Sequence, residues 1–293
     1  MTQPKRLFCF GFGFTARVLA GRLRGNDWSV AATCRTEEKR DALRDEGIPA
    51  HLFDRDRPLD DAATVLDGAT CILSSVPPDA TGDPVLDHHR ADIAALAGEN
   101  APWIGYLSTT GVYGTRDGGW VDEDSELTPT TERGRRRVAA EDRWLGLWRD
   151  HAIPVHLFRL AGIYGPGRNQ IEQVRAGRAR RVVKPGQVFS RTHVDDIASV
   201  LEASIENPNP GRAYNVCDDE AAPPQDVVAY ACDLLGVEPP PAIPFEEAEM
   251  TDMGRSFYAE NKRVRNDRIK TELGVSLAYP TYREGLRALL AAA

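Results

Sequence analysis

The feature of this sequence that most constrains its fold is a glycine-rich turn between two apolar segments. Residues 6–10 (RLFCF) are apolar after the first and are typical of a buried strand. Residues 11–16 read GFGFTA, and residues 17–23 (RVLAGRL) continue with the apolar spacing of a helix. A strand that passes through a GxGxxA turn into a helix opens a βαβ unit, so we predict that the chain begins as an α/β fold.

The same turn contains the residue types that a bound dinucleotide requires. Gly11 permits the tight turn, Gly13 has no Cβ to obstruct a pyrophosphate, and Ala16 lets the helix pack closely on the strand. The first turn of the helix, with Phe14 and Thr15, offers free N–H groups and the positive end of the helix dipole. We therefore predict a dinucleotide site here, and a Gly-rich turn without a ligand is the alternative.

The end of the next predicted strand indicates which dinucleotide binds. Residues 28–34 (WSVAATC) form this strand, and an NAD site usually places Asp or Glu near its end to bind the ribose 2′-hydroxyl. Here Arg35 follows the strand, and no carboxylate occurs before Glu37. Arg35 can pair with a 2′-phosphate through a charge-assisted, bidentate contact. NADP is therefore favoured over NAD, and a solvated Arg35 at the start of a helix is the alternative.

Short apolar runs alternate with helical patterns over the first part of the chain. Strands are expected at 6–10, 28–34, 49–53, 69–75, 102–108 and 154–160. Helices are expected at 14–24, 37–46, 59–66, 84–98 and 130–150. Nearly continuous apolar strands that alternate with helices predict a parallel sheet covered on both faces, which is the doubly wound α/β architecture.

After about residue 165 this alternation becomes irregular. The expected elements are helices at 169–178, 195–206, 224–235, 263–273 and 281–291, strands at 181–183 and 213–216, and a stiff Pro-rich connector at 238–244. We expect residues 1–165 to form the dinucleotide-binding domain, to which residues 187–217 return. Residues 166–186 and 218–293 are expected to form a smaller C-terminal α/β lobe that faces the substrate.

Composition excludes several classes of function. A net charge of −8 over 293 residues argues against nucleic-acid binding. The five cysteines form no CxxC pair and have no His at metal spacing, so we expect no metal site and a reducing, cytoplasmic environment. Without a leader-like segment or an apolar run of bilayer length, no membrane association is expected. Arginine clusters at 133–137 and 175–181 fit either solvated helix faces or an anionic substrate.

Several short motifs follow one another in a characteristic order. They are YLSTTGVYG at 106–114, RLAGIYGPG at 159–167, RTHVDDIA at 191–198 and YNV at 214–216. With these motifs the chain resembles the extended short-chain dehydrogenase/reductase superfamily over nearly its whole length. The resemblance implies a Rossmann fold and a hydride-transfer or epimerase-type site. In such a site a Ser or Thr acts with a Tyr and a Lys in a YxxxK arrangement.

Alignment on the VYG segment carries the Ser/Thr role to Thr109, beside Tyr113. The Thr109 hydroxyl can hydrogen-bond a substrate oxygen, or it can bond the backbone at the strand end. Arg133 occupies the position of the catalytic Tyr, and Arg137 occupies that of the Lys. Arg137 can still donate to the nicotinamide ribose. A guanidinium remains protonated near neutral pH, so Arg133 cannot replace the Tyr as a proton donor.

Two possibilities follow from the missing Tyr and Lys. Arg133 can stabilise an oxyanion or an anionic substrate while water or another group moves the proton; the candidates for that group are Tyr113, Tyr164, Lys184 and His193. Alternatively, the protein is a non-catalytic NAD(P) sensor or scaffold. The candidates have structural interpretations too, such as loop packing for the two tyrosines and the start of a helix for His193.

Other positions complete the expected cofactor groove. Asp54 ends the third strand, where superfamily members commonly place an Asp near the adenine, and a helix cap is the alternative. Ser75 and Val76 follow the fourth strand and are expected to line the groove through their backbone. Gly162 stands where many sugar-nucleotide members carry Asn, so a nucleotide-sugar substrate is not favoured.

The missing YxxxK motif, the GxGxxA turn and the chain length are similar to the atypical YeeZ-like branch of the superfamily. This resemblance implies an NAD(P)-dependent epimerase or reductase-like protein that acts on a small polar or anionic substrate. In the wider superfamily the helix after position 137 often forms a dimer interface. Trp144 and Trp148 lie four residues apart on this helix. They can belong either to a homodimer interface or to the core of a single chain.

Overall fold

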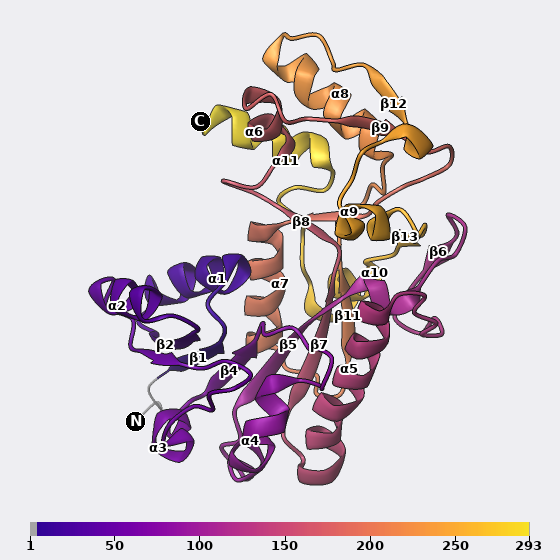
Figure 1. Cartoon of the computed structure of the whole chain (residues 1–293). Helices are drawn as coiled ribbons and strands as arrows, with labels where there is room; N and C mark the ends of the chain where they lie inside the picture. Colours follow the sequence, from indigo (N-terminus) through magenta and orange to yellow (C-terminus); the bar gives the residue numbers. More distant parts are fainter. Residues whose placement is uncertain (1–4, 293) are drawn as a thin grey trace. The chain divides into compact units, whose positions relative to one another are not determined.

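A seven-stranded sheet with the strand order β11-β7-β5-β4-β1-β2-β3 is the centre of the computed structural model, which describes residues 5–292 (Figure 1). Its strands are β1 (Arg6–Phe10), β2 (Ser29–Cys34), β3 (Ala50–Leu52), β4 (Cys71–Ser74), β5 (Trp103–Thr109), β7 (Val155–Leu160) and β11 (Ala213–Val216). The chain starts in the middle at β1, winds out to β3, and returns to β4 before winding out the other way. This order confirms the predicted doubly wound parallel sheet, with a switch point between β1 and β4.

Helices cover the sheet on both faces. They are α1 (Phe14–Arg24), α2 (Glu37–Asp45), α3 (Ala62–Leu66), α4 (Pro84–Ala94), α5 (Glu132–His151) and α7 (Val194–Glu206). Side chains of α3, α4 and α5 form one core cluster with Phe8, Phe10 and Tyr106 of the sheet. Because both faces are covered, the strands are buried along almost their whole length, as their continuous apolar sequence predicts.

The chain divides into two compact units by its internal contacts. The first contains the residues up to 109 together with 135–159 and 198–214, and the second contains 110–134, 160–197 and 215–293. The bounds differ from the expected ones chiefly at 110–134 and 187–197, which cluster with the second unit. The first unit therefore holds nearly all of the large sheet, including the glycine-rich turn.

The second unit is built from short strand pairs and helices. Its pairs, all parallel, are β8 (Gly162–Tyr164) with β10 (Arg191–His193), β9 (Arg181–Val183) with β12 (Ala242–Pro244), and β6 (Trp120–Val121) with β13 (Arg263–Val264). The helical elements are η1 (Thr110–Tyr113), α6 (Gln170–Arg175), α8 (Pro224–Leu235), η2 (Phe245–Glu247), α9 (Asp252–Phe257), α10 (Asp267–Leu273) and α11 (Tyr282–Ala291). Side chains of α6, α8 and α11 form its core.

Two expectations for this unit were wrong. The Pro-rich segment at 238–244 is not only a connector, because Ala242–Pro244 pairs with β9. The helix expected at 263–273 begins at Asp267, and Arg263–Val264 is strand β13. Strands of two or three residues are too short to show an alternating pattern, and prolines normally argue against a strand unless it lies at an edge.

Candidate functional site

The glycine-rich turn adopts a conformation that requires glycine. Gly11 has φ +81°, and a Cβ at this position would lie 2.8 Å from Ser75 Oγ and 3.4 Å from Val76 Cγ2. The Ser75 hydroxyl lies within hydrogen-bond distance of the backbone oxygens of Phe10 and Gly11, at 3.3 and 3.1 Å. The Gly11 N–H donates to Thr33 Oγ1 at 2.8 Å. The start of the loop after β4 is thus packed directly against the turn after β1.

Gly13, by contrast, faces open space. A Cβ here would meet no atom within 4 Å, and Gly13 is the N-cap of α1 without a side-chain hydrogen bond to the first N–H groups. The first turn of α1 has no acidic residue, and Ala16 is fully buried against the strand. The turn therefore has the form that a pyrophosphate requires, with helix N–H groups that are not capped by a side chain and room above the backbone.

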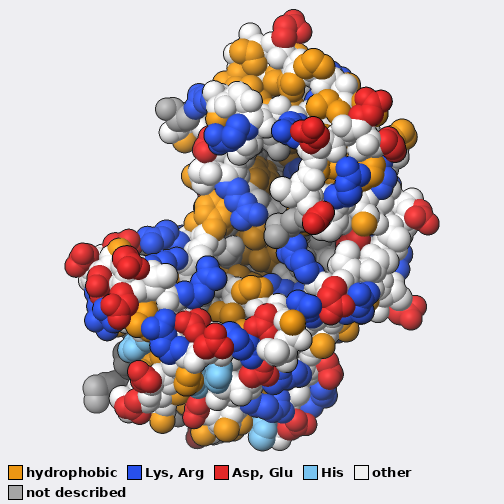
Figure 2. Space-filling model, in the orientation of Figure 1, with side chains coloured by type: hydrophobic (Ala, Val, Ile, Leu, Met, Phe, Trp, Pro, Cys, Tyr) orange, Lys and Arg blue, Asp and Glu red, His pale blue; other side chains and the backbone are white. Residues whose placement is uncertain are grey.

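Basic side chains surround the end of β2. Arg35 is exposed, Lys39 Nζ donates to the Phe12 carbonyl at 2.8 Å, and Arg57 donates to the Arg35 carbonyl at 2.8 Å. Burial raises the pKa of the Cys34 thiol, while the charges of Lys39, Arg57 and two further arginines of α2 act in the opposite direction. Several positive charges therefore act at this strand end. Figure 2 shows basic and acidic side chains interspersed over the adjoining surfaces of α1 and α2.

Asp54 lies in the loop directly after β3 and forms a local turn. Its carboxylate accepts hydrogen bonds from the Asp56 N–H at 3.0 Å and from Arg57 at 2.8 Å. Burial raises the pKa of Asp54, but these bonds outweigh it and leave the pKa below its ordinary value. The helix-cap interpretation was wrong, because the next helix begins at Ala62 with Asp61 as its N-cap. A contact with adenine stays a prediction.

The end of β5 is connected to α5 by polar side chains. Thr109 is the last residue of β5 and is half-buried. The preceding Ser108 is buried and donates to the Glu141 carboxylate at 2.5 Å. Arg137 donates to the Tyr106 hydroxyl at 2.9 Å and to the Leu107 carbonyl at 2.7 Å. The position of the superfamily's Lys thus holds a guanidinium that binds the strand, and donation to a ribose stays a prediction.

Arg133 lies in the first turn of α5 and is exposed. Its guanidinium carbon lies 5.7 Å from the centre of the Phe257 ring, and it has no hydrogen bond or ion pair among residues 5–292. A Cβ at the neighbouring Gly134 would lie 2.8 Å from the Gly111 carbonyl and 2.7 Å from Pro129 Cβ. The start of α5 therefore packs closely on the turn that follows β5, and Arg133 projects from this junction.

The candidate proton donors occupy different surroundings within the second unit. Tyr113 is fully buried and donates to Asn215 Oδ1 at 2.7 Å. Tyr164 is also buried, and Lys184 donates to the carbonyl of Tyr258. His193 is buried, and its Nδ1 accepts from the Asp195 N–H at 3.2 Å in the first turn of α7.

Sequence reasoning missed several residues that organise the first unit. Lys39 lies four positions after Arg35, so the helix carries its amine back to the glycine turn. Glu141 lies four positions after Arg137, so both face β5 from one side of α5. Periodicity places these residues on a helix face, and only the folded chain shows what each contacts.

Within residues 5–292, no group of three or more His, Cys, Asp and Glu side chains is arranged to hold a metal ion. No helix in the same part of the chain is both long and apolar enough to cross a bilayer. All five cysteines are free and buried.

Comparison with known proteins agrees with this architecture. No family model matches the chain. It is 28% identical to protein YeeZ of Escherichia coli K12 over 288 residues, which cover 94% of this chain and 97% of YeeZ. The structure of a conserved protein of unknown function from Silicibacter pomeroyi is 53% identical over 99% of both chains, with a TM-score of 0.91.

The fold also extends to distant enzymes. The dTDP-glucose 4,6-dehydratase of Bacillus anthracis, solved with NAD, matches over 98% of this chain and 96% of its own, with a TM-score of 0.76 and 15% identity. At that identity the likeness concerns the fold alone. The chain therefore belongs to the same family as the Silicibacter pomeroyi protein, is similar to YeeZ over nearly its whole length, and has the fold of the NAD-dependent epimerases and dehydratases.

Proposed function

We propose that this protein binds NADP(H) and acts as a reductase or epimerase on a small polar or anionic substrate, by a mechanism that does not use the usual Tyr and Lys pair. The observation that carries the proposal is the glycine turn. Gly11 is required by its backbone, whereas Gly13 leaves open space beside the N–H groups of α1. A turn with this combination fits a pyrophosphate.

The preference for NADP over NAD is supported by charge at the end of β2. No carboxylate follows β2 before Glu37, and Arg35 is exposed there with Lys39 and Arg57 nearby. Lys39 and Arg57 already donate to backbone carbonyls, so their charges are held in place before a ligand arrives. A 2′-phosphate would meet these positive charges, and Arg35 would supply the bidentate contact.

Each remaining candidate has a defined chemical task in this proposal. Bound NADPH supplies a hydride. Thr109 donates a hydrogen bond to the substrate oxygen that gains negative charge, and Arg137 holds the end of β5 through its bonds to Tyr106 and Leu107. Arg133 binds an anionic group of the substrate, because its guanidinium has an aromatic contact but no acidic partner in the described chain. The proton comes from water or from a neighbouring group.

Binding of each nucleotide tests the cofactor assignment. We expect calorimetry to give at least tenfold tighter binding of NADPH than of NADH, and Arg35→Met and Lys39→Met to remove most of that difference while binding of NADH changes little. Arg40→Met is the matched control, because Arg40 lies on the same helix and pairs with its neighbour Asp41 at 2.9 Å. Equal affinity for both nucleotides would overturn the NADP preference, and uptake of neither would overturn the whole proposal.

A second function, a non-catalytic NADP sensor or scaffold, is favoured by one observation, the Arg at position 133. A panel of carbonyl and sugar substrates assayed by NADPH oxidation separates the two functions. Turnover that Thr109→Val abolishes supports the enzyme. Tight NADPH binding without turnover of any substrate in the panel supports the sensor. In that case the background rate of NADPH oxidation should be the same in Thr109→Val as in the wild type.

Self-association through α5 is also part of the proposal. Trp144 is fully buried and stacks on Tyr106 with the ring centres 5.5 Å apart, so this residue belongs to the core. Trp148 is 36% exposed and is the tryptophan of α5 that a second copy would cover. Sedimentation of Trp148→Glu tests this: we expect a dimer for the wild type and a monomer for the variant.

A further inference from the structure

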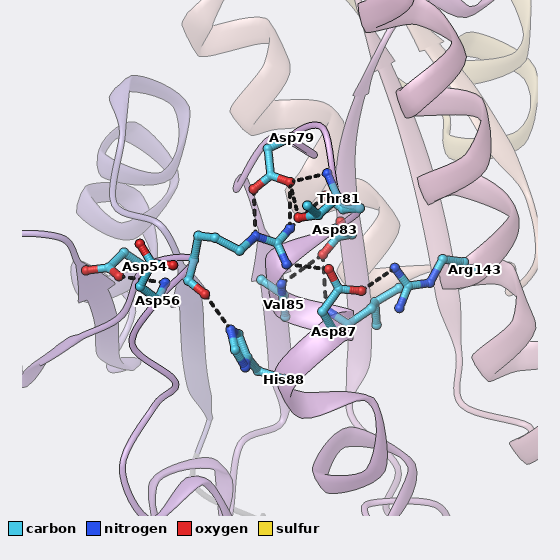
Figure 3. A network of polar contacts seen from close by, with 12 residues as sticks. Asp54, Asp56, Asp79, Thr81, Asp83, Val85, Asp87, His88 and Arg143 are labelled. Atoms are coloured by element: carbon cyan, nitrogen blue, oxygen red, sulfur yellow. Dashed lines mark hydrogen bonds and ion pairs between the residues drawn. The ribbon is translucent and has the colours of Figure 1, made fainter.

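Arg55 binds a four-residue turn through three acceptors. Its Nε donates to Asp79 Oδ2 at 2.6 Å, and its Nη2 donates to Asp79 Oδ1 and to the Gly82 carbonyl, both at 2.9 Å (Figure 3). Thr81 also donates to Asp79 through its N–H and its hydroxyl, and the Asp79 N–H donates to Gly82. The turn thus binds one guanidinium through three acceptors that are themselves held in place. This arrangement is more specific than an ion pair between two solvated side chains.

The network continues from this turn into two helices. Arg55 Nη1 lies 2.5 Å from Asp87 in α4, and Arg143 of α5 binds the other Asp87 oxygen at 2.6 Å (Figure 3). Gly82 has φ +140°, and a Cβ there would lie 3.0 Å from Asp87 and 3.1 Å from Arg143. The turn therefore closes directly over the charged groups, and only glycine fits this position without strain.

Electrostatics agree with this geometry. Partial burial acts to raise the pKa of both Asp79 and Asp87, but the hydrogen bonds from Arg55 outweigh it and leave both pKa values lowered. The two carboxylates therefore stay ionised at neutral pH and keep Arg55 in place. Within residues 5–292, Asp87 also pairs with Arg143, whereas Asp79 has an ion pair with Arg55 alone.

The position of the network in the sheet suggests its purpose. Arg55 directly follows Asp54 at the end of β3, and the Asp79 turn follows Ser75 and Val76 at the end of β4. Two positions further along the same loop, Arg57 binds the Arg35 carbonyl at the end of β2. Two arginines of one loop thus join the carboxyl ends of β2, β3 and β4, with β1 lying between β4 and β2, along the edge where an open α/β sheet binds its ligand.

We infer that Arg55 is a positioning residue of the dinucleotide site. It holds the loops after β3 and β4 in the arrangement that receives the adenosine half of the cofactor. This inference rests on the proposed function. Because the loops are ordered before binding, the ligand does not have to order them, and affinity for the adenosine end rises accordingly.

The test compares fragments of the cofactor in calorimetry. Adenosine 2′,5′-bisphosphate probes the adenosine end and nicotinamide mononucleotide probes the other. For Arg55→Met we expect binding of the adenosine probe to weaken about tenfold, with binding of the nicotinamide probe unchanged; Arg55→Lys should lie between Met and wild type. Arg90→Met is the control, since Arg90 of α4 is similarly exposed and pairs with Asp150 of α5 at 2.9 Å, away from both loops.

A charge effect is separated from positioning by the double variant Arg55→Met, Asp79→Asn, which has the net charge of the wild type. We expect the tenfold loss to persist in it; recovery of affinity would overturn the inference in favour of long-range electrostatics. Without ligand, amide hydrogen exchange should accelerate at residues 54–60 and 76–83 in Arg55→Met and not in Arg90→Met.

The outcomes for this inference and for the proposed function are distinct. If the wild type binds the adenosine probe and Arg55→Met binds it equally well, the inference is wrong and the proposed function stands. If exchange in both loops is unchanged in Arg55→Met, the inference is again wrong. If the wild type binds neither probe nor NADPH, both fail together.

Discussion

Arg159 and Glu141 form an ion pair of 2.8 Å in the interior of the first unit, where their side chains are 7% and 3% exposed. Ser108 donates to the same carboxylate at 2.5 Å. The group joins β5, α5 and β7, just before the strand end that carries Thr109. It fixes the position of α5 on the sheet and, with it, the position of Arg137.

The first prediction concerns this buried pair. Glu141→Gln removes the negative charge that faces the buried Arg159 guanidinium, so we expect the free energy of unfolding to fall by about 3 to 5 kcal/mol. Urea denaturation measures it. Asp142→Asn is the control on the same helix, because Asp142 and Arg149 form an exposed pair whose loss costs less than about 1 kcal/mol. Equal effects of the two substitutions would contradict the prediction.

The second prediction concerns the buried carboxylate of Asp218, which is 4% exposed. Burial raises its pKa well above the ordinary value, and the nearby Arg191 only partly offsets this. The folded state therefore favours the protonated acid. Stability is lost as pH rises from the unfolded pKa, about 3.9, toward the higher folded pKa.

We accordingly expect Asp218→Asn to exceed the wild type in stability at pH 7 by on the order of 1 to 3 kcal/mol and to match it near pH 4. Thermal unfolding between pH 4 and pH 8 gives the comparison. Asp219→Asn is the control, since that carboxylate is partly exposed and lies beside Lys270. A wild type that gains stability over the variant as pH rises would disprove the assignment.

The third prediction separates ligand binding from folding at Gly13. This residue has the extended backbone of a helix N-cap, φ −93° and ψ −162°, and open space beside it. Gly13→Ser adds a capping side chain where a pyrophosphate would lie. We expect stability to be unchanged or to rise by a few tenths of a kcal/mol, while NADPH affinity falls at least tenfold, about 1.4 kcal/mol.

Gly21→Ala in the middle of α1 is its control, because a Cβ there also meets no atom within 4 Å. This substitution should raise stability by roughly 0.5 to 1 kcal/mol and leave nucleotide binding unchanged. Differential scanning fluorimetry and calorimetry report the two quantities separately. Undiminished NADPH binding by Gly13→Ser would show that the ligand does not occupy this turn.

The fourth prediction concerns packing in the second unit between Gly285 of α11 and Tyr164 of β8. A Cβ at position 285 would lie 2.1 Å from the Tyr164 hydroxyl oxygen. Gly285→Ala should therefore cost about 1 to 3 kcal/mol through overpacking. Tyr164→Phe removes that oxygen, so the double variant should recover part of the loss in a double-mutant cycle. Purely additive effects would mean that the two residues do not meet.

Much of the fold could be predicted because the relevant signals are local. Strands β1 to β5 and helices α1, α2 and α4 follow the apolar runs and periodicity of the sequence closely, with ends displaced by a few residues. The glycine turn was recognisable because Gly11 must accept a positive φ and because Gly13 and Ala16 have small side chains at fixed spacing. Such requirements concern one residue and its immediate neighbours.

The pairing of distant side chains could not be predicted in the same way. Arg55 and Asp79 are 24 positions apart, and nothing in the apolar pattern distinguishes them from other surface charges. The short strand β12 was likewise hidden, because its pairing with β9 joins segments about 60 residues apart and includes a proline.

The sequence by itself determined the doubly wound order of elements and the glycine-rich turn after β1, because backbone conformation and burial periodicity are encoded residue by residue. Only the tertiary structure decided which charges meet, including Arg55 with Asp79, Glu141 with Arg159 and Arg137 with the end of β5. The reason is physical: a charged side chain can be satisfied by many partners or by water, and chain closure over long separations selects one of them.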